Sequence, residues 1–266
     1  MNITIIGSGY VGLVTGVCLS DAGHKVICVD KDKSKIANLS RGQIPIYEPG
    51  LETLVKKNIK EENLSFSSNI KSSLNASKII FIAVGTPTSL EGDNADLSQI
   101  YSCAKEISES LQDESIIIVK STVPVGTCDK IEEIISKKNP TKKFEVISNP
   151  EFLREGSAIR DFENPDRIVV GTSSKKAIES IKEIYKRQIE KEYPIIFTSR
   201  KSSELIKYAS NSMLAMRIIF INEIADLCEK VGANVEDIAN GIGLDKRIGP
   251  HFLNAGPGFG GSCFPK

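Results

Sequence analysis

The sequence is poor in the residues and runs that mark several classes of protein. It has two histidines and no C-x-x-C pair among its six cysteines, which argues against a zinc site, and we expect no metal ion. Lysine plus arginine equals aspartate plus glutamate at 34 each, so the basic excess behind nonspecific nucleic-acid binding is missing. No apolar run approaches the roughly 18–20 residues of a membrane-spanning helix. We therefore expect neither nucleic acid nor membrane as a partner.

The amino-terminal segment also lacks the features of an export signal. MNITIIGSGYVGLVTG carries no basic region and runs directly into glycines. We therefore expect a cytoplasmic protein whose cysteines stay reduced. Five of the six cysteines stand within helical or strand patterns, or near a helix start, and are interpreted as small core residues: Cys18, Cys28, Cys103, Cys128 and Cys228.

Short apolar runs alternate with amphipathic segments over the first 200 residues. The runs are typical of parallel strands covered by helices on both faces, and they predict strands at residues 3–7, 25–30, 78–85, 115–120, 144–148, 166–172 and 193–199. Helical spacing of apolar residues is found between them, at residues 97–111, 130–137 and 175–189. This alternation predicts an α/β fold built on a doubly wound parallel sheet.

The pattern changes after Ser199. No proline or glycine interrupts residues 202–231, where apolar residues recur at helical spacing, so we expect one helix of about 30 residues and roughly 45 Å. Its broad apolar surface fits a buried spine or a surface shared between subunits, and the sequence leaves both open. A shorter helix is expected at 235–242, before a glycine-rich end. We therefore divide the chain into a first domain at 1–200 and a helical domain at 201–266.

The segment Gly7-Ser8-Gly9-Tyr10-Val11-Gly12 fits the pattern G-x-G-x-x-G and stands between a predicted strand and a helix. Gly7 permits the tight turn, Gly9 lets a pyrophosphate approach, and Gly12 lets helix and strand pack closely. Asp30 ends the next predicted strand, where its carboxylate would bind ribose hydroxyls and repel a 2′-phosphate. The pattern predicts a Rossmann-like domain that prefers NAD to NADP, with a turn or helix-cap role as the alternative for Asp30.

Small hydroxyl residues follow two further predicted strands. They lie in Val84-Gly85-Thr86-Pro87-Thr88 and in Ser121-Thr122-Val123-Pro124. In an open α/β sheet, ligands bind outside the carboxyl ends of the strands. These residues would line the cofactor pocket, initiate the next helices, or do both.

Three other places carry side chains suited to chemistry, each with a structural alternative. Cys263 stands among glycines, where a bare backbone lets a ligand reach a nucleophilic thiol, or it is only a small loop residue. Lys207 and Asn211 share a helix face and would stabilise an oxyanion, unless that face is solvated. Glu151 and Glu155 follow a predicted strand, at the functional edge of the sheet or in the first turn of a helix.

Nine segments, in the order of the family, resemble the UDP-glucose 6-dehydrogenases within the UDP-glucose/GDP-mannose dehydrogenase group: GSGYVGL, IPIYEPGL, VGTPT, KSTVPVGT, NPEFLREGSA, KYASNSMLA, NEIADLCE, DKRIG and FLNAGPGFGGSCFPK. The resemblance implies that the C6 alcohol of UDP-glucose becomes a carboxylate through an enzyme-bound thioester, with two NAD reduced. It also implies an all-helical dimerisation domain around the long helix, and hence a homodimer or a higher oligomer.

The resemblance implies roles for individual residues. Cys263 matches the nucleophile, and Lys207 and Asn211 match the pair that stabilises the oxygen on C6. Thr122 and Glu155 match residues that manage a water and its proton, with Glu151 beside the substrate. The implied NAD-binding positions are Gly7, Gly9, Tyr10, Val11, Gly12, Asp30, Lys35, Val84, Gly85, Thr86, Pro87, Ser121, Thr122, Glu155 and Cys263. The implied substrate-binding positions are Glu151, Phe152, Leu153, Arg154, Glu155, Lys207, Asn211, Arg247, Phe252, Asn254, Gly258 and Gly260, with Arg247 reaching the substrate of a neighbouring subunit.

The sequence departs from the family at its end, because family members continue past residue 266. An aspartate would follow Lys266, and a third domain would hold much of the uridine diphosphate. Three alternatives stay open. The enzyme would act on GDP-mannose or a UDP-N-acetylhexosamine, or it would be a two-electron β-hydroxyacid dehydrogenase, against which Cys263 argues. The third alternative is a noncatalytic NAD-binding dimerisation fragment.

Overall fold

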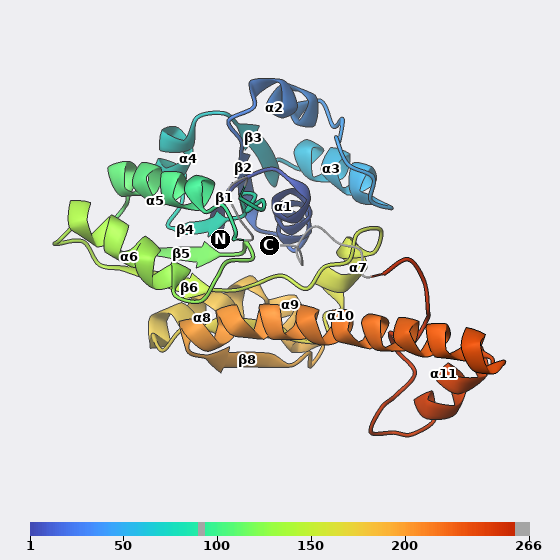
Figure 1. Cartoon of the computed structure of the whole chain (residues 1–266). Coiled ribbons are helices and arrows are strands. Elements are labelled where there is room, and N and C mark those ends of the chain that lie inside the picture. Colours follow the sequence, from blue (N-terminus) through green and yellow to red (C-terminus); the bar gives the residue numbers. More distant parts are fainter. Residues whose placement is uncertain (90–93, 259–266) are drawn as a thin grey trace. The chain divides into compact units, whose positions relative to one another are not determined.

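The strands predicted from the apolar runs lie side by side in one sheet (Figure 1). The computed structural model describes residues 1–89 and 94–258, and the chain divides into two units, Met1–Leu205 and Ile206–Lys266. The sheet belongs to the first unit and has the order β3-β2-β1-β4-β5-β6-β7-β8. Its strands are β1 (Asn2–Ile6), β2 (Lys25–Val29), β3 (Leu64–Ser67), β4 (Ile79–Ile82), β5 (Ser115–Val119), β6 (Phe144–Ser148), β7 (Ile168–Gly171) and β8 (Ile195–Thr198).

The strand order reverses at β1, which pairs in parallel with β2 on one side and β4 on the other. Ile3 of β1 is opposite Val26 of β2 and Ile79 of β4. Because the chain winds outward in both directions from this pair, the carboxyl ends of β1 and β4 mark the switch point at which doubly wound sheets bind ligands. The predicted doubly wound α/β fold is confirmed.

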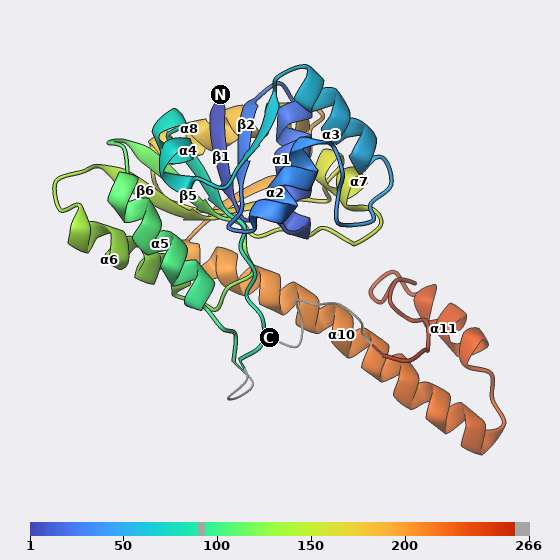
Figure 2. The ribbon, with the colours of Figure 1, turned by 90° about the horizontal axis from the view of Figure 1, so that it is seen from above.

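Apolar side chains alternate between two cores, one on each face of the sheet. Helices cover both faces (Figure 2). In β4, Ile79 and Phe81 belong to one core, while Ile80 and Ile82 belong to the other. Helices α1 (Tyr10–Asp21), α3 (Leu51–Lys60), α7 (Ala158–Glu163) and α8 (Lys175–Ile184) contribute to the first core, and α4 (Ile70–Ala76), α5 (Ser98–Ser110) and α6 (Thr127–Lys138) contribute to the second. The double burial explains why these strands read as continuous apolar runs.

The sheet is not parallel throughout. β6 and β7 pair in the antiparallel sense through Ser148 and Gly171, and β8 is parallel to β7. The predicted parallel sheet thus holds from β3 to β6, and its last two strands run in the opposite direction. A run of buried apolar residues has the same pattern in either strand direction, so the apolar pattern alone could not predict this reversal.

The structure contains elements that the apolar pattern did not predict. Between β2 and β4 the chain forms α2 (Lys33–Ser40), α3, β3 and α4. β3 was missed because it is a four-residue edge strand, LSFS, in which polar and apolar residues mix. The predicted helix at 175–189 is two helices, α8 and α9 (Lys186–Glu190), with Tyr185 between them.

The long helix is present as α10 (Arg200–Val231), which has 32 residues, and α11 (Val235–Gly243) follows. In the second unit, the Arg217 guanidinium donates hydrogen bonds to the carbonyl oxygens of Ile248 at 2.7 Å and Gly249 at 2.8 Å. The Gly256 N–H donates to Asn222 Oδ1 at 2.9 Å. These contacts hold the segment after α11 against the long helix. Within the described residues, no helix combines the length and apolar character needed to cross a lipid bilayer.

The five cysteines that the structure describes are buried, with exposed fractions between 0% and 4%. Burial raises the pKa of Cys28 to about 12 and likewise that of Cys103 to about 12. A thiol with so high a pKa is a poor nucleophile near neutral pH. Their interpretation as core residues is confirmed, including Cys128 near the start of α6.

Candidate functional site

The glycine loop turns at the carboxyl end of β1, and its three glycines have different surroundings. Gly7 has a φ of +100°, and a Cβ on it would lie 2.5 Å from the carbonyl oxygen of Ala83, just past β4. A Cβ on Gly12 would lie 1.8 Å from the Gly7 oxygen. Apart from its chain neighbours, no described atom lies within 4 Å of a Cβ built on Gly9. Two glycines thus allow close packing, and Gly9 leaves the backbone open to a ligand.

Helix α1 begins directly after this loop. Its N-cap residue is Gly9, which has no side chain to bond the N–H groups of the first turn. Those groups form the positive end of the helix dipole, which favours phosphate. The hydroxyl of Ser8 is buried and has no hydrogen-bond partner among the described residues. The N–H groups of the first turn therefore offer donors to a pyrophosphate.

The Asp30 carboxylate lies beside the glycine loop. It accepts hydrogen bonds from the backbone N–H of Ser8 at 3.0 Å and of Asp32 at 3.1 Å, and from Lys35 Nζ at 2.8 Å. Burial raises the pKa of Asp30, but the Lys35 ammonium and the backbone donors outweigh it and hold the pKa below its ordinary value. The N-cap of α2 is Asp32, so Asp30 is not the helix cap that the sequence left open.

The segments after β4 and β5 are tied to each other by hydroxyl groups. Ser121 Oγ donates to the carbonyl oxygen of Val84 at 2.7 Å, and Thr86 Oγ1 donates to that of Thr122 at 2.9 Å. All three hydroxyl residues are buried. Helices α5 and α6 have other residues as their N-caps, so these hydroxyls do not initiate helices. Together with residues 84–87, they follow the carboxyl ends of β4 and β5 and form the rim of the candidate cofactor site.

The acidic segment after β6 precedes a helix and does not form its first turn. Glu151 is 5% exposed and accepts the Leu153 N–H at 2.5 Å, whereas Glu155 is exposed, and α7 starts only at Ala158. Arg154 Nε and its backbone N–H donate to Asp161 at 3.0 and 2.8 Å. The substrate-contact role expected for Arg154 would therefore compete with its intramolecular ion pair with Asp161.

Phe152 completes the segment. Its ring lies under the guanidinium of Arg167, with 3.8 Å between the guanidinium carbon and the ring centroid. This distance is well within the range of a cation–π contact. The contact connects the segment to the residues just before β7.

One buried acid at this edge was missed by the sequence reasoning. Glu48, in the loop between α2 and α3, is 4% exposed and bonds the Tyr10 hydroxyl and the Gly156 N–H. It lies in IPIYEPGL, a segment that carried the family resemblance but to which no role was given. An acid between aromatic, proline and glycine residues is a weak signal of a buried carboxylate. Only the folded chain brings its partners together.

In the second unit, Lys207 and Asn211 lie one turn apart on α10. Lys207 is 5% exposed, and Asn211 is partly buried. The alternative of a solvated helix face is therefore wrong for Lys207. A buried ammonium group beside an amide is a suitable donor pair for a developing negative charge.

The segment after α11 holds further expected substrate residues. Arg247 forms an ion pair with Asp245 at 2.6 Å, and its side chain is 90% exposed. Phe252 has a φ of +61°, Asn254 is exposed, and Gly258 has a φ of +112°. The positive φ angles of Phe252 and Gly258 are typical of an irregular loop and not of a helix or strand. Gly260 and Cys263 lie outside the described residues.

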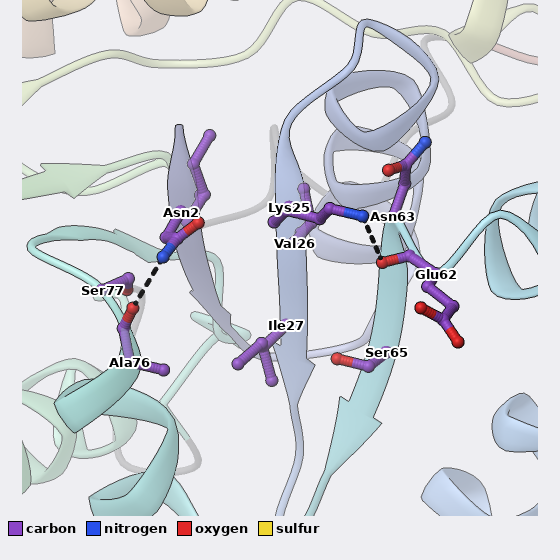
Figure 3. A pocket seen from close by; sticks show the side chains of 10 residues that line it. Asn2, Lys25, Val26, Ile27, Glu62, Asn63, Ser65, Ala76 and Ser77 are labelled. Carbon is purple, nitrogen blue, oxygen red and sulfur yellow. Dashed lines mark hydrogen bonds between the residues drawn. The ribbon is translucent and has the colours of Figure 1, made fainter.

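A cavity of about 310 Å³ lies at the amino ends of the strands, opposite the end that carries the glycine loop (Figure 3). Its walls include Asn2 and Lys25, the first residues of β1 and β2, and Glu62 and Asn63 before β3. Asn2 Nδ2 donates to the Ala76 oxygen at 3.3 Å within it. Because the glycine loop follows the carboxyl end of β1, this cavity is separate from the candidate cofactor site.

Comparison with known proteins gives consistent matches to both parts of the chain. Residues 1–189 match the NAD-binding domain of the UDP-glucose/GDP-mannose dehydrogenase family, and residues 201–266 match its central domain. A UDP-glucose 6-dehydrogenase of Rhizobium meliloti (strain 1021) is 58% identical over the whole chain. The chain spans 61% of the length of that relative.

Solved structures agree with the fold. A UDP-glucose dehydrogenase from Pyrobaculum islandicum superposes on 99% of the chain with a TM-score of 0.94 at 38% identity, and 61% of its length is covered. A GDP-mannose dehydrogenase from Pseudomonas aeruginosa, in a ternary complex, matches the whole chain with a TM-score of 0.89 at 35% identity, and 62% of its length is covered.

Proposed function

The chain belongs to the UDP-glucose/GDP-mannose dehydrogenase family, and from this premise we propose that the protein oxidises UDP-glucose at C6 to UDP-glucuronate in two NAD-dependent steps. The observation that carries the choice of substrate is the 58% identity to a UDP-glucose 6-dehydrogenase over the whole chain, against 35% to the GDP-mannose dehydrogenase. The geometry that supports the choice of cofactor is the open glycine loop beside an ionised Asp30.

The residues at this edge fit NAD. Gly9 and the first turn of α1 would receive the pyrophosphate, and Asp30 with Lys35 would hold the ribose hydroxyls. The rim formed by residues 84–87, Ser121 and Thr122 would face the rest of the cofactor. NAD, when bound, accepts the hydride that leaves C6 in each oxidation.

Side chains of this chain would carry out the reaction at C6. Lys207 and Asn211 would stabilise negative charge on the C6 oxygen. The Cys263 thiolate would add to the C6 aldehyde and give a thiohemiacetal, and its oxidation gives a thioester. Water then cleaves the C–S bond and leaves the carboxylate and the free thiol. Thr122 and Glu155 would hold this water and take its proton.

The sugar nucleotide would lie along two segments. Glu151 to Glu155 would line one side, and Phe252, Asn254, Gly258 and Gly260 the other. Arg247 would reach the substrate of a neighbouring subunit in a homodimer. The exposure of its side chain supports such a role. The dimer itself is supported by apolar residues of α10 that are about half exposed, namely Met213, Met216, Ile219, Phe220 and Leu227.

Substrate profiling of the full-length protein tests this proposal, because we expect the 266 residues alone to show no steady turnover. UDP-glucose, GDP-mannose and a UDP-N-acetylhexosamine are compared by kcat/KM, with NADH formation followed at 340 nm. We expect UDP-glucose to be preferred by at least about tenfold, with two NADH formed for each sugar nucleotide consumed. Preference for another sugar nucleotide would contradict the substrate, one NADH per turnover would contradict the thioester route, and NAD binding without turnover would favour a noncatalytic module.

A further inference from the structure

Glu48 forms a buried link between two segments that are far apart in the sequence. Its side chain lies between the start of α1 and the loop before α7, both in the first unit. One carboxylate oxygen, Oε2, accepts the Tyr10 hydroxyl and the Gly156 N–H, the latter at 2.9 Å. The other oxygen, Oε1, accepts the Ile159 N–H at 3.4 Å. One side chain thus receives three donors, one each from α1, from the loop before α7 and from α7.

The Gly156 N–H belongs to the peptide bond that follows Glu155. This N–H also reaches the Tyr10 hydroxyl oxygen at 3.0 Å, so Tyr10 and Glu48 hold the same peptide. Gly156 has a φ of +84°, a conformation that other residues rarely adopt. The turn after Glu155 is therefore defined by the backbone as well as by the two side chains.

The link places Glu155 near the glycine loop. Burial raises the pKa of Tyr10, and the hydrogen bond with Glu48 and the negative charges of Glu48 and Glu155 raise it further. The Tyr10 hydroxyl therefore stays protonated and remains a donor to Glu48. Tyr10 is the first residue of α1, directly after Gly9. The Glu155 peptide is thus attached to the element that would bind the pyrophosphate.

We propose that Glu48 is a positioning residue that holds the Glu155–Gly156 peptide against the start of α1 and thereby sets the place of Glu155 relative to the bound cofactor. The inference rests on the proposed function, in which Glu155 handles the water that cleaves the thioester. A buried carboxylate suits the task, because its two oxygens can satisfy several converging donors without competing for them.

The alternative is that Glu48 only stabilises the fold. Both roles predict a lower melting temperature when Glu48 is changed, so stability alone does not separate them. A positioning role further predicts a fall in kcat that exceeds any change in NAD affinity. A small displacement of a catalytic group costs up to about 100-fold in rate.

The experiment compares Glu48→Gln, Tyr10→Phe and the double variant in the full protein, with Glu52→Gln as the control. Glu52 is four residues further on, and its side chain is 56% exposed in a surface ion pair with Lys56. Glutamine at 48 keeps one acceptor oxygen but turns the other into a donor, which faces a backbone N–H. Three quantities are measured: kcat and KM with UDP-glucose, the Kd of NAD, and hydrogen exchange of residues 154–160.

We expect Glu48→Gln to lower kcat by about 10–100-fold while the Kd of NAD changes less than about threefold. Hydrogen exchange of residues 154–160 should become faster in Glu48→Gln and stay unchanged in Glu52→Gln. The double variant should lose less activity than the product of the two single losses, because Tyr10 and Glu48 share one peptide.

A Glu48→Gln protein with unchanged exchange at 154–160, or with kcat within twofold of the unmodified protein, would overturn the proposal even if its melting temperature fell. The exchange measurement needs no turnover. Should the unmodified protein fail to oxidise UDP-glucose, the proposed function would fail, and hydrogen exchange would still decide whether Glu48 holds the peptide.

Discussion

At Asp30 a single carboxylate meets two backbone donors and one ammonium group, so its removal changes both charge and hydrogen bonding. In Asp30→Ala, NAD would lose its proposed ribose partner, and Lys35 would become available to a 2′-phosphate. We expect weaker NAD binding and a smaller gap between NAD and NADP, measured as two dissociation constants. Asp32→Asn keeps the cap of α2 and should preserve the gap. Equal affinities of the unmodified chain for the two cofactors would refute the role of Asp30.

Substitutions of Cys263 and Lys207 should impair different steps of the reaction in the full-length protein. Cys263→Ser should stop acid formation, because a hydroxyl is far less ionised than a thiol near neutral pH, yet NAD binding should stay nearly intact. The first oxidation needs no thiol, so a single turnover of NADH can survive. Lys207→Ala removes charge from both oxidations and should slow even the first by roughly 10²–10³-fold. Rapid-mixing measurements at 340 nm distinguish the two, and full steady-state acid production by Cys263→Ser would refute the covalent route.

Protonation of His24 should make the free energy of unfolding depend on pH. Burial lowers the pKa of His24 below its ordinary value of 6.5, and the nearby amino terminus of Met1 adds to the effect. The unfolded chain therefore binds this proton more readily, so the free energy of unfolding should fall as the pH drops below 6.5. In His24→Gln this dependence should be weaker between pH 7.5 and 5.5 in urea titrations, whereas His251→Gln should keep it. Identical slopes in all three proteins would contradict the assignment.

At the scale of elements, Glu204 connects the start of α10 to α6 within the first unit. Its two oxygens accept the N–H groups of Gly126 at 2.7 Å and Cys128 at 2.8 Å, and the residue is 2% exposed. Gly126, the N-cap of α6, has no side chain to cap the helix, so a distant carboxylate does so.

Loss of this cap should be costly. Glu204→Ala leaves two buried donors without an acceptor, and we expect it to lower the free energy of unfolding by about 1–3 kcal/mol. Chemical denaturation provides the measurement. Glu109→Ala, which removes a surface ion pair with Lys138, is the control and should cost less than about 1 kcal/mol. An equal cost for both variants would show that the Glu204 cap adds no special stability.

At the scale of the whole molecule, the apolar surface of α10 predicts self-association. Phe220 and Leu227 are 47% and 52% exposed and lie two turns apart on the helix. Exposed apolar patches of this kind usually mark a partner surface. Phe220→Asp and Leu227→Asp should shift sedimentation at tens of micromolar from dimer toward monomer. Ile196→Asp, at a 44% exposed residue of β8, should leave the dimer intact, and a monomeric unmodified protein would refute the interface.

Local patterns in the sequence were sufficient for several features. The glycine spacing, the acid at the end of β2, the alternation of apolar runs and the uninterrupted helix all depend on residues close together in the chain. They predicted the glycine loop, most strands and α10. The apolar pattern failed for β3, a short edge strand that is half polar, and for the direction of β7 and β8.

Contacts between distant residues were decided only by the tertiary structure. Glu48 meets Gly156 across 108 residues, and Glu204 meets Gly126 across 78. Neither acid differs in its local sequence from an exposed one, because a carboxylate is equally compatible with solvent and with a ring of donors. The burial of Lys207, like these two contacts, depends on which surfaces pack together. The sequence by itself thus determined most strands, the long helix and the glycine loop. Packing decided which charged side chains are buried and which segments they hold in place.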